Sequence, residues 1–335
     1  MDIRKYFIIN NKKKINNLNF KYFYLYWVKS KIVIGFYKIQ PEKVNFSKII
    51  NCRDLKSKII ICGYFKNNNN KNPICKIENI KSVFSNKSFS LLKSQLQKSI
   101  RKGLIDISLM TAFEMYLLNE IQFLRRLAII IIEDVEYINK WFSIICWFIC
   151  SYPLKKMDNN QIRYLFGFIK SLCLYKKFEY VKKHEIDVAE IIDGIKKFNF
   201  LERNCILSLL IRASYGGTSG DVKFLRCKAL EYKNKFKNNF KLENNINVKP
   251  LTIIKRLEKN EIIFCACDFH INPKIIDIIA EKFKLEKQII KKTIWHSSSN
   301  INFRKVEITK YNNIWLKIKK EYNKLARKYI FRVTR

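Results

Sequence analysis

The chain has few of the residues that form tight turns and phosphate-binding loops. Its 335 residues include only 8 glycines and 5 prolines, whereas glycine alone averages about 7% of residues. This scarcity argues against Gly-rich phosphate-loop enzymes, against propellers and sandwiches with many tight turns, and against linker-rich architectures. The P-loop pattern G-x-x-x-x-G-K-[ST] is also absent.

Long apolar runs are missing as well. The longest, 141–152, is much shorter than the roughly 20 residues that cross a membrane, so we expect a buried core helix and no membrane partner. The N-terminus lacks the apolar region of a secretory signal. Several of the ten cysteines, such as Cys146 and Cys150, lie in apolar runs. We therefore expect an intracellular, reducing compartment (nucleus, organelle or viral replication site) and no disulfide framework.

Acidic residues are scarce relative to basic ones. Lys and Arg total 66 and Asp and Glu total 28, which gives a net charge of +38. A hydrophobic content of 48% is too high for a disordered polycation, so the chain should fold around a core. The charge favours a nucleic-acid partner. A membrane surface or acidic protein partner is an alternative. A further alternative is that the charge reflects AT-rich codon bias and has no functional role, because Arg contributes only 14 of the 66 basic residues.

The patterns along the chain predict a mainly α fold, a helical bundle or collar-like core with a small N-terminal α+β module. Aromatic and β-branched residues over 20–38 indicate one or two strands with a turn near 29–30, and 58–64 indicates another. We assign this module to 1–85.

Helical spacing begins near residue 88 and predicts a helical core domain over 86–237, followed by a basic C-terminal helical region over 238–335. Pro153 should end a core helix over 138–152. Further helices are expected over 161–175, 187–198, 201–213, 221–232, 273–284 and 313–331.

The most specific segment is 95–134. It contains Leu96, Gln97, Lys98, Ser99, Ile100, Arg101, Gly103 and Asp106, then Ala112, then Arg125, Arg126 and Leu127, and finally Glu133 and Asp134. This pattern resembles the helical region that follows the ATPase core in the replication-associated recombination protein A family, the Werner-helicase-interacting type of clamp-loader-like AAA+ proteins. The resemblance implies a helical collar that mediates oligomerisation beside a DNA-handling motor.

The chain departs from that family in two ways. Only about 90 residues precede the segment, too few for an ATPase core, and Glu136 stands where the family has glycine. The resemblance covers about 40 residues. It therefore implies at most a collar-like domain without ATP hydrolysis, with a homo-oligomer or a replication complex as partner.

The same charged residues have an interpretation that needs no family. Arg125, Arg126, Glu133 and Asp134 flank the apolar run 127–132. Charges beside a buried run are expected to be partly desolvated and paired with residues of other helices. Structural ion pairs of Glu133 and Asp134 are the first expectation. Phosphate contacts by the arginines and acid–base catalysis by the carboxylates are the alternatives.

Three of the eight glycines lie together after Arg212. The possible phosphate loop comprises Ser214, Gly216, Gly217, Thr218, Ser219 and Gly220, whose backbone amides and hydroxyls are suited to cradle a phosphate. The alternative is a helix end followed by a new helix with Ser219 or Asp221 as its N-cap.

A weak metal-site candidate is Cys265, Cys267 and His270. These residues offer three ligands, but a structural zinc site needs a fourth. The alternatives are a buried strand end capped by Asp268 and a Cys–His nucleophile pair. We expect no cofactor.

The C-terminal residues 304–335 include eleven basic and two acidic residues. Tyr322, Tyr329 and Phe331 are interleaved with them as candidates to stack on bases. A Trp/Ile/Tyr/Leu stripe in the same helix is expected to dock against the core or another subunit. Across the chain, the expected nucleic-acid contacts are Arg101, Arg125, Arg126, Arg212, Arg304, Lys305, Lys319, Lys320, Lys324, Arg327 and Lys328.

These observations favour a non-enzymatic nucleic-acid-binding accessory protein, first of all in DNA replication or repair. An RNA-binding or ribosome-associated protein of an AT-rich organelle or virus is the alternative. A nuclease-type enzyme is a second alternative. Against it, the sequence shows no compact Asp/Glu/His cluster and has only 3 histidines.

Overall fold

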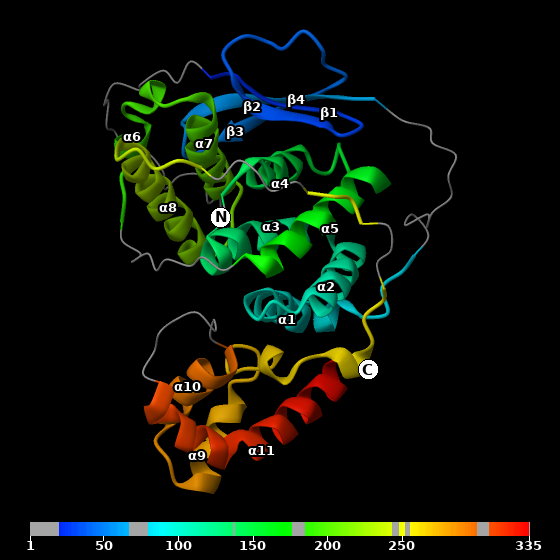
Figure 1. The fold of residues 1–335 in the computed structure, drawn as a ribbon, viewed down its shortest axis with the longest axis vertical. Helices are drawn as coiled ribbons and strands as arrows, with labels where there is room; N and C mark the ends of the chain where they lie inside the picture. The colour runs from blue at the N-terminus through cyan, green and yellow to red at the C-terminus, as the bar shows by residue number, and fades with distance from the viewer. Residues whose placement is uncertain are drawn as a thin grey trace, which may run out of the picture. The chain divides into compact units, whose positions relative to one another are not determined.

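A computed structural model describes residues 20–66, 80–136, 138–175, 185–242, 248–251, 255–299 and 308–334. Over these ranges the chain forms eleven α-helices and one four-stranded sheet (Figure 1). The mainly α class with a small N-terminal β-containing module is therefore confirmed.

The chain divides into two compact units, and each combines two separate stretches of sequence. The first unit comprises 1–66 and 182–241, and the second comprises 67–181 and 242–335. This differs from the three consecutive segments expected from composition. The physical reason lies in the first unit, where Asn204 and Ser214 of the second stretch hydrogen-bond to Phe36 and Cys52 of the N-terminal strands.

The sheet of the first unit consists of β1 (Tyr22–Val28), β2 (Lys31–Tyr37), β3 (Phe46–Cys52) and β4 (Ser57–Phe65), in the order β2-β1-β4-β3. The β1–β2 and β3–β4 pairs are antiparallel, and β1 runs parallel to β4. The predicted turn at 29–30 joins β1 to β2, with Lys29 at a φ of 56°. The strand predicted over 58–64 is β4.

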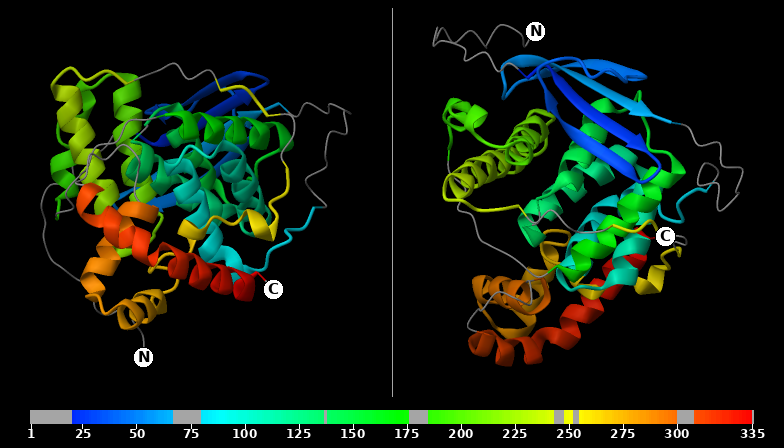
Figure 2. Two further views of the ribbon diagram at one scale, coloured as in Figure 1. Left: turned by 60° about the horizontal axis from the view of Figure 1, so that its bottom comes forward. Right: turned by 45° about the horizontal axis from the view of Figure 1, so that its top comes forward.

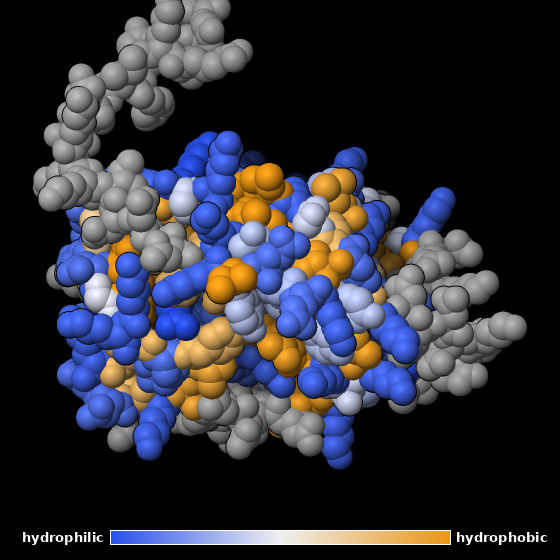
Figure 3. Space-filling view, turned by 90° about the horizontal axis from the view of Figure 1, so that it is seen from above, coloured by the Kyte–Doolittle hydropathy of each residue, from blue (hydrophilic) through white to orange (hydrophobic). Residues whose placement is uncertain are grey.

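The two faces of the sheet differ in character. Phe23, Leu25 and Trp27 of β1 point to one face and are buried. The other face carries tyrosines, of which Tyr26 and Tyr64 stack with ring centroids 5.6 Å apart. Figure 3 shows the molecule from above, where hydrophobic clusters lie among hydrophilic side chains.

Three helices complete the first unit: α6 (Val188–Ile192), α7 (Phe200–Ser214) and α8 (Ser219–Lys237). Asn204 of α7 accepts a hydrogen bond from the Phe36 amide of the edge strand β2 at 2.9 Å. A Cβ at Gly35 would overlap the Phe200 ring, so glycine allows this close approach. A polar side chain and a glycine thus join α7 to the strand edge.

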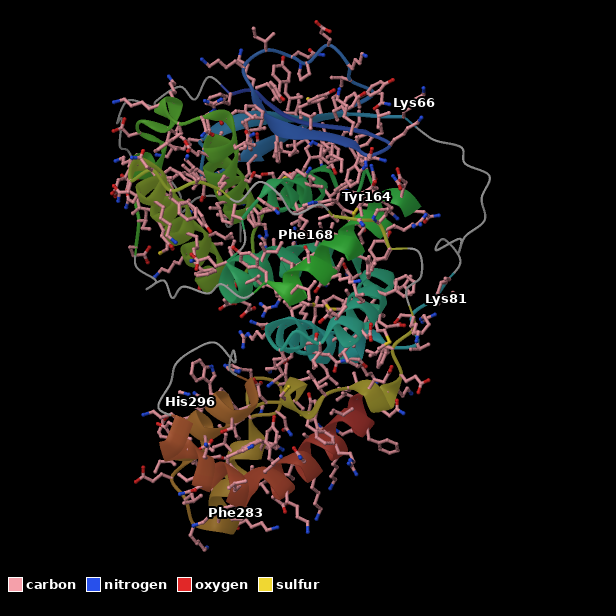
Figure 4. All side chains as sticks on the ribbon, in the orientation of Figure 1. Lys66, Lys81, Tyr164, Phe168, Phe283 and His296 are labelled. Carbon is pink, nitrogen blue, oxygen red and sulfur yellow. The ribbon has the colours of Figure 1, made fainter. Side chains whose placement is uncertain are left out.

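The second unit contains α1 (Phe89–Arg101), α2 (Ile105–Leu118), α3 (Glu120–Ile130), α4 (Lys140–Ser151) and α5 (Asn159–Leu174). The helix α4 is buried along nearly its whole length, as expected for the apolar run before Pro153. Its Trp141 stacks on Phe168 and Tyr164 of α5, with ring centroids 5.5 and 6.3 Å away. Figure 4 labels Phe168 and Tyr164 on α5. Among the described helices, none combines the length and apolar character needed to span a bilayer.

The same unit ends in α9 (Lys274–Phe283), α10 (Lys287–Ile294) and α11 (Ile308–Val333), which pack against one another (Figure 2). The buried stripe of α11 is Ile318, Tyr322, Ala326 and Ile330. The four-residue spacing places these side chains on one face of the helix. Of the apolar stripe expected from the sequence, Ile318 and Tyr322 are buried, whereas Trp315, Leu325 and Tyr329 are half-buried.

Candidate nucleic-acid interface

The helix α11 presents cations on the side opposite its buried stripe. Its exposed basic side chains are Lys317, Lys319, Lys320, Lys324, Arg327, Lys328 and Arg332. The helix contains one acidic residue, Glu321. The Glu321 carboxylate accepts a hydrogen bond from Lys282, which lowers the pKa of Glu321. The outward side of α11 is thus strongly positive, and its single carboxylate is engaged with a lysine of α9.

Part of this basic face forms a groove of about 580 Å³. Its lining residues are Phe264, Lys320, Asn323, Lys324, Arg327, Lys328 and Phe331. All except Phe264 belong to α11. The other residues follow Lys320 by three, four, seven, eight and eleven positions, and residues at these spacings lie on one side of a helix. The groove therefore combines four cations, an amide and two phenylalanine rings. We call it the α11 groove.

Phe264 forms the wall of the α11 groove that does not belong to the helix. It begins the short 3₁₀ turn Phe264–Ala266. Its carbonyl accepts a hydrogen bond from the Tyr322 hydroxyl at 3.2 Å, and the Arg327 guanidinium lies 5.4 Å from the centre of its ring. The wall is therefore fixed to α11 by a hydrogen bond and a cation–π contact.

The three aromatic residues expected to stack on bases have different surroundings. Tyr322 is buried, with 1% exposure, so the stacking role predicted for it is wrong. Tyr329 is half-buried, and Arg332 lies 4.9 Å from its ring centre. Phe331 is 59% exposed and lines the α11 groove. Phe331 is thus the ring among the three that combines high exposure with a place in the groove.

A buried ion pair lies behind this region. The Lys98 ammonium is 2.6 Å from the Asp268 carboxylate and also donates to the Ser94 hydroxyl at 2.7 Å. Burial raises the pKa of Asp268, but the hydrogen bond from His270 and the charge of Lys98 outweigh it, so the pKa lies well below its usual value. For Lys98, burial lowers the pKa despite the opposing effect of Asp268. This pair stabilises the junction between α1 and the turn that precedes α9.

Cys265, Cys267 and His270 do not form a metal-binding group, and the described residues contain no cluster of three or more His, Cys, Asp or Glu side chains suited to one. Burial raises the pKa of Cys265 and raises that of Cys267 to about 12, which disfavours the thiolate that a metal requires. His270 is exposed, and its amide donates to Asp268 at 3.0 Å. The alternative of a capping Asp268 fits this geometry, although the segment forms 3₁₀ turns rather than a strand.

Two side-chain contacts link the first part of the segment 95–134 to its last part. Arg101 donates to Asp134 at 2.6 Å, with the Asp134 side chain fully buried. This confirms the ion pair expected for Asp134. Arg126 donates to Gln97 of α1, while Arg125 and Glu133 are half-buried. The contacts of Arg101 and Arg126 lie within the helical core, and none of these residues lines the α11 groove.

The glycine-containing loop ends one helix and begins the next. Arg212 is buried and donates to the Gly216 carbonyl at 2.5 Å. Thr218 caps α8 by accepting from the Asp221 amide at 3.1 Å, so Thr218 takes the role expected of Ser219 or Asp221. Gly216 and Gly217 have φ values of 83° and 140°, which explains the glycines. The capping alternative therefore accounts for this loop; Gly220 is the second residue of α8.

Ser214 has a structural role in the same unit. Its hydroxyl accepts from the Asp54 amide at 3.0 Å and donates to the Leu210 carbonyl at 3.0 Å. Asp54 in turn accepts two hydrogen bonds from Arg226, at 2.9 and 2.8 Å. These contacts join the β3–β4 turn to α7 and α8. The Ser214 hydroxyl is therefore engaged in hydrogen bonds inside the protein.

The structure thus brings together part of the expected set of cations. Lys320, Lys324, Arg327 and Lys328 line the α11 groove, and Lys319 is exposed on the same helix. Arg304 and Lys305 lie outside the described residues. Sequence reasoning missed Phe264 and Asn323. Asn323 could have been predicted, because its spacing from Lys320 and Arg327 places it on the same side of the helix. No local pattern indicated Phe264.

Comparisons of the chain with protein-family models, with curated proteins and with solved structures find no match. The resemblance of 95–134 therefore stays a prediction.

Proposed function

We propose that the protein is a non-enzymatic accessory factor that binds nucleic acid through the basic face of α11, with DNA replication or repair as its setting. The observation that carries the proposal is the α11 groove, where four cations lie side by side and none of the described lining residues is acidic. Such a surface is complementary to a phosphate backbone.

The spacing of these cations suits a polyphosphate chain. Lys320 and Lys328 are eight residues apart, which corresponds to about 12 Å along a helix axis. That distance covers three to four phosphates of one strand at about 3.4 Å each along a duplex. Two turns of α11 therefore offer cations to several consecutive phosphates.

The chemistry of the face predicts binding with little sequence preference. Three of the four groove cations are lysines, whose ammonium groups act as point charges rather than as planar, bidentate readers of bases. The setting in DNA metabolism is supported by the resemblance of 95–134, because lysine–phosphate contacts alone do not distinguish DNA from RNA.

The test measures binding of the full chain to labelled nucleic acids by fluorescence anisotropy at two salt concentrations. The probes are single-stranded DNA, duplex DNA and duplex RNA. We expect a steep salt dependence, and at least a tenfold loss of affinity in the variant K320Q/K324Q/R327Q/K328Q.

The matched control removes four exposed charges from the sheet-containing unit, in K21Q/K38Q/K58Q/K66Q. We expect this control to bind more tightly than the α11 variant. Equal losses in the two variants would mean that net charge, not the α11 face, drives binding, and would overturn the proposal. A higher affinity for duplex RNA than for the DNA probes would contradict the setting in DNA metabolism and would indicate an RNA-binding protein.

A further inference from the structure

We infer that the α11 groove is built for single-stranded nucleic acid, with an unpaired base stacked on Phe331 while the neighbouring lysines hold the phosphates. This inference rests on the proposed function and specifies its substrate class. It is carried by the position of one exposed ring at the end of a row of cations.

Phe331 combines exposure with a charged setting. Its side chain is 59% exposed, yet it shares the groove with Lys320, Lys324 and Lys328. An exposed phenylalanine ring makes no favourable contact with water. Together with the surrounding cations, it is complementary to a ligand that carries both flat apolar rings and negative charges. Bases joined by phosphates have this composition, and aromatic rings interleaved with basic residues are typical of single-strand binding sites.

The spacing along α11 matches the connectivity of such a strand. Lys328 precedes Phe331 by three residues, about 4.5 Å along the helix axis. A phosphate on Lys328 and a base on Phe331 are therefore close enough to belong to the same or adjacent nucleotides. Lys324 and Lys320 continue the row of cations away from the ring, toward the N-terminal end of the helix.

The other side of the groove is suited to the edge of a base. Asn323 lines the groove and has an amide that both donates and accepts hydrogen bonds. Arg327 is positioned over the Phe264 ring, with its guanidinium 5.4 Å from the ring centre. A stacked base would therefore meet an apolar ring, an amide and an oriented guanidinium, which is a sequence-tolerant arrangement because every base has a π-face.

A duplex gains the phosphate contacts but not the stacking contact. Its bases are already stacked on each other, and a ring on the protein surface reaches the face of a base only when that base leaves the stack. Phe331 should thus contribute to binding of single strands and contribute nothing to binding of duplexes. A protein partner with an acidic and apolar surface would use the same ring, and the experiment below distinguishes it.

The experiment compares F331A, F331L and F331W with the unaltered chain. Binding is measured by fluorescence anisotropy to a labelled 20-residue oligo-dT, to the corresponding oligo-rU and to a 20-base-pair DNA duplex. Loss of one stacked base should weaken oligo-dT binding by F331A about 5- to 150-fold. F331L should lose nearly as much because it lacks a π-face, F331W should restore the affinity, and duplex binding should change less than about twofold.

The matched control is L316A. Leu316 is 72% exposed on the same helix but does not line the α11 groove, so its removal should leave all three affinities unchanged. Equal affinity of F331A and the unaltered chain for oligo-dT, or an equal loss on the duplex, would overturn the inference. Capture of acidic peptides instead of oligonucleotides by this face would also overturn it.

The two proposals fail in different ways. If K320Q/K324Q/R327Q/K328Q loses binding and F331A does not, the α11 face still binds phosphates and the single-strand inference falls. If neither variant affects binding, the proposed function falls as well. Tighter binding of oligo-rU than of oligo-dT retains the stacking site and identifies RNA as the source of the strand.

Discussion

The ammonium of Lys98 lies 2.6 Å from the carboxylate of Asp268, and both side chains are almost completely buried. The contact joins α1 to a residue that is 170 positions away in the sequence. Asp268 follows Phe264, the wall of the α11 groove, by only four residues. The pair therefore positions the groove wall on the helical core, and its loss should affect both stability and the groove.

The first prediction concerns this pair. In K98M the Asp268 carboxylate loses its lysine partner and keeps its contacts with His270. A buried charge without its counter-ion costs about 3–5 kcal/mol of unfolding free energy. The double variant K98M/D268N should lose less than the sum of the single variants, because no buried charge remains. Urea unfolding followed by circular dichroism measures both. The exposed pair Lys287–Asp277 is the control, and K287M should change stability little. Additive losses would contradict the assigned contact.

The second prediction is a pH dependence of the same site. The pKa of Asp268 is lower in the folded chain than in the unfolded one, where it is about 3.9. The folded state therefore gains stability from this group above about pH 3.9 and loses it as the pH falls toward the folded-state pKa. The stability advantage of the unaltered chain over D268N should be larger at pH 5.5 than at pH 3.5, as measured by urea unfolding. An advantage that does not shrink on acidification would contradict the assignment.

Much of the local structure was predictable because it depends on short-range patterns. The β1–β2 hairpin follows from aromatic and β-branched runs on both sides of Lys29 and Ser30, and α4 follows from an apolar run that ends before Pro153. The buried stripe of α11 follows from the spacing of Ile318 and Tyr322. Such elements are determined by residues within one or two turns of one another.

Two features escaped prediction for different reasons. The strand β3 pairs with its neighbour β4 across a short turn, but its apolar residues are interrupted by Ser47, Lys48 and Asn51, which weakens the local signal. Phe264 becomes a groove wall only because Tyr322 and Arg327, far along the chain, lie against it. No periodicity within a segment encodes such pairings, so the cations of the α11 groove could be predicted from the sequence and its wall could not.

The third prediction concerns a contact of this long-range kind. Glu114 is fully buried and accepts hydrogen bonds from Arg256 at 2.5 Å and from Ser82 at 2.6 Å. In E114Q the ion pair is lost while the shape is kept. Because the Arg256 side chain is 35% exposed and water can solvate it, we expect a loss of about 1–3 kcal/mol. Denaturant unfolding measures it. The exposed Glu281 gives the control E281Q, and similar stabilities of the two variants would contradict the pairing.

The fourth prediction separates capping from phosphate binding in the loop before α8. T218A removes the side chain that caps the helix, which should cost about 1 kcal/mol and lower the melting temperature. S219A, one residue further on, removes an exposed hydroxyl and should leave the melting temperature unchanged. Neither variant should alter the affinity for oligonucleotides. A loss of affinity in S219A would restore the loop as a phosphate site.

The last prediction uses the salt dependence of binding to decide which cations contact phosphates. Each phosphate contact contributes about 0.7 to 0.9 to the slope of log K against log salt. The single variant K324Q should reduce the slope by about that amount, because Lys324 is exposed in the α11 groove. R126Q should leave the slope unchanged, because Arg126 donates to Gln97 within the helical core.

Both variants remove one positive charge, so the change in net charge cannot explain a difference between them. The measurement is a series of anisotropy titrations between 50 and 200 mM salt (about a fourfold range), with circular dichroism to show that both variants are folded. Equal slopes for K324Q and R126Q would place the phosphate contacts elsewhere. A smaller slope for R126Q alone would return the interface to the segment 95–134, and the family resemblance of that segment would then point to the binding surface better than the charge of α11 does.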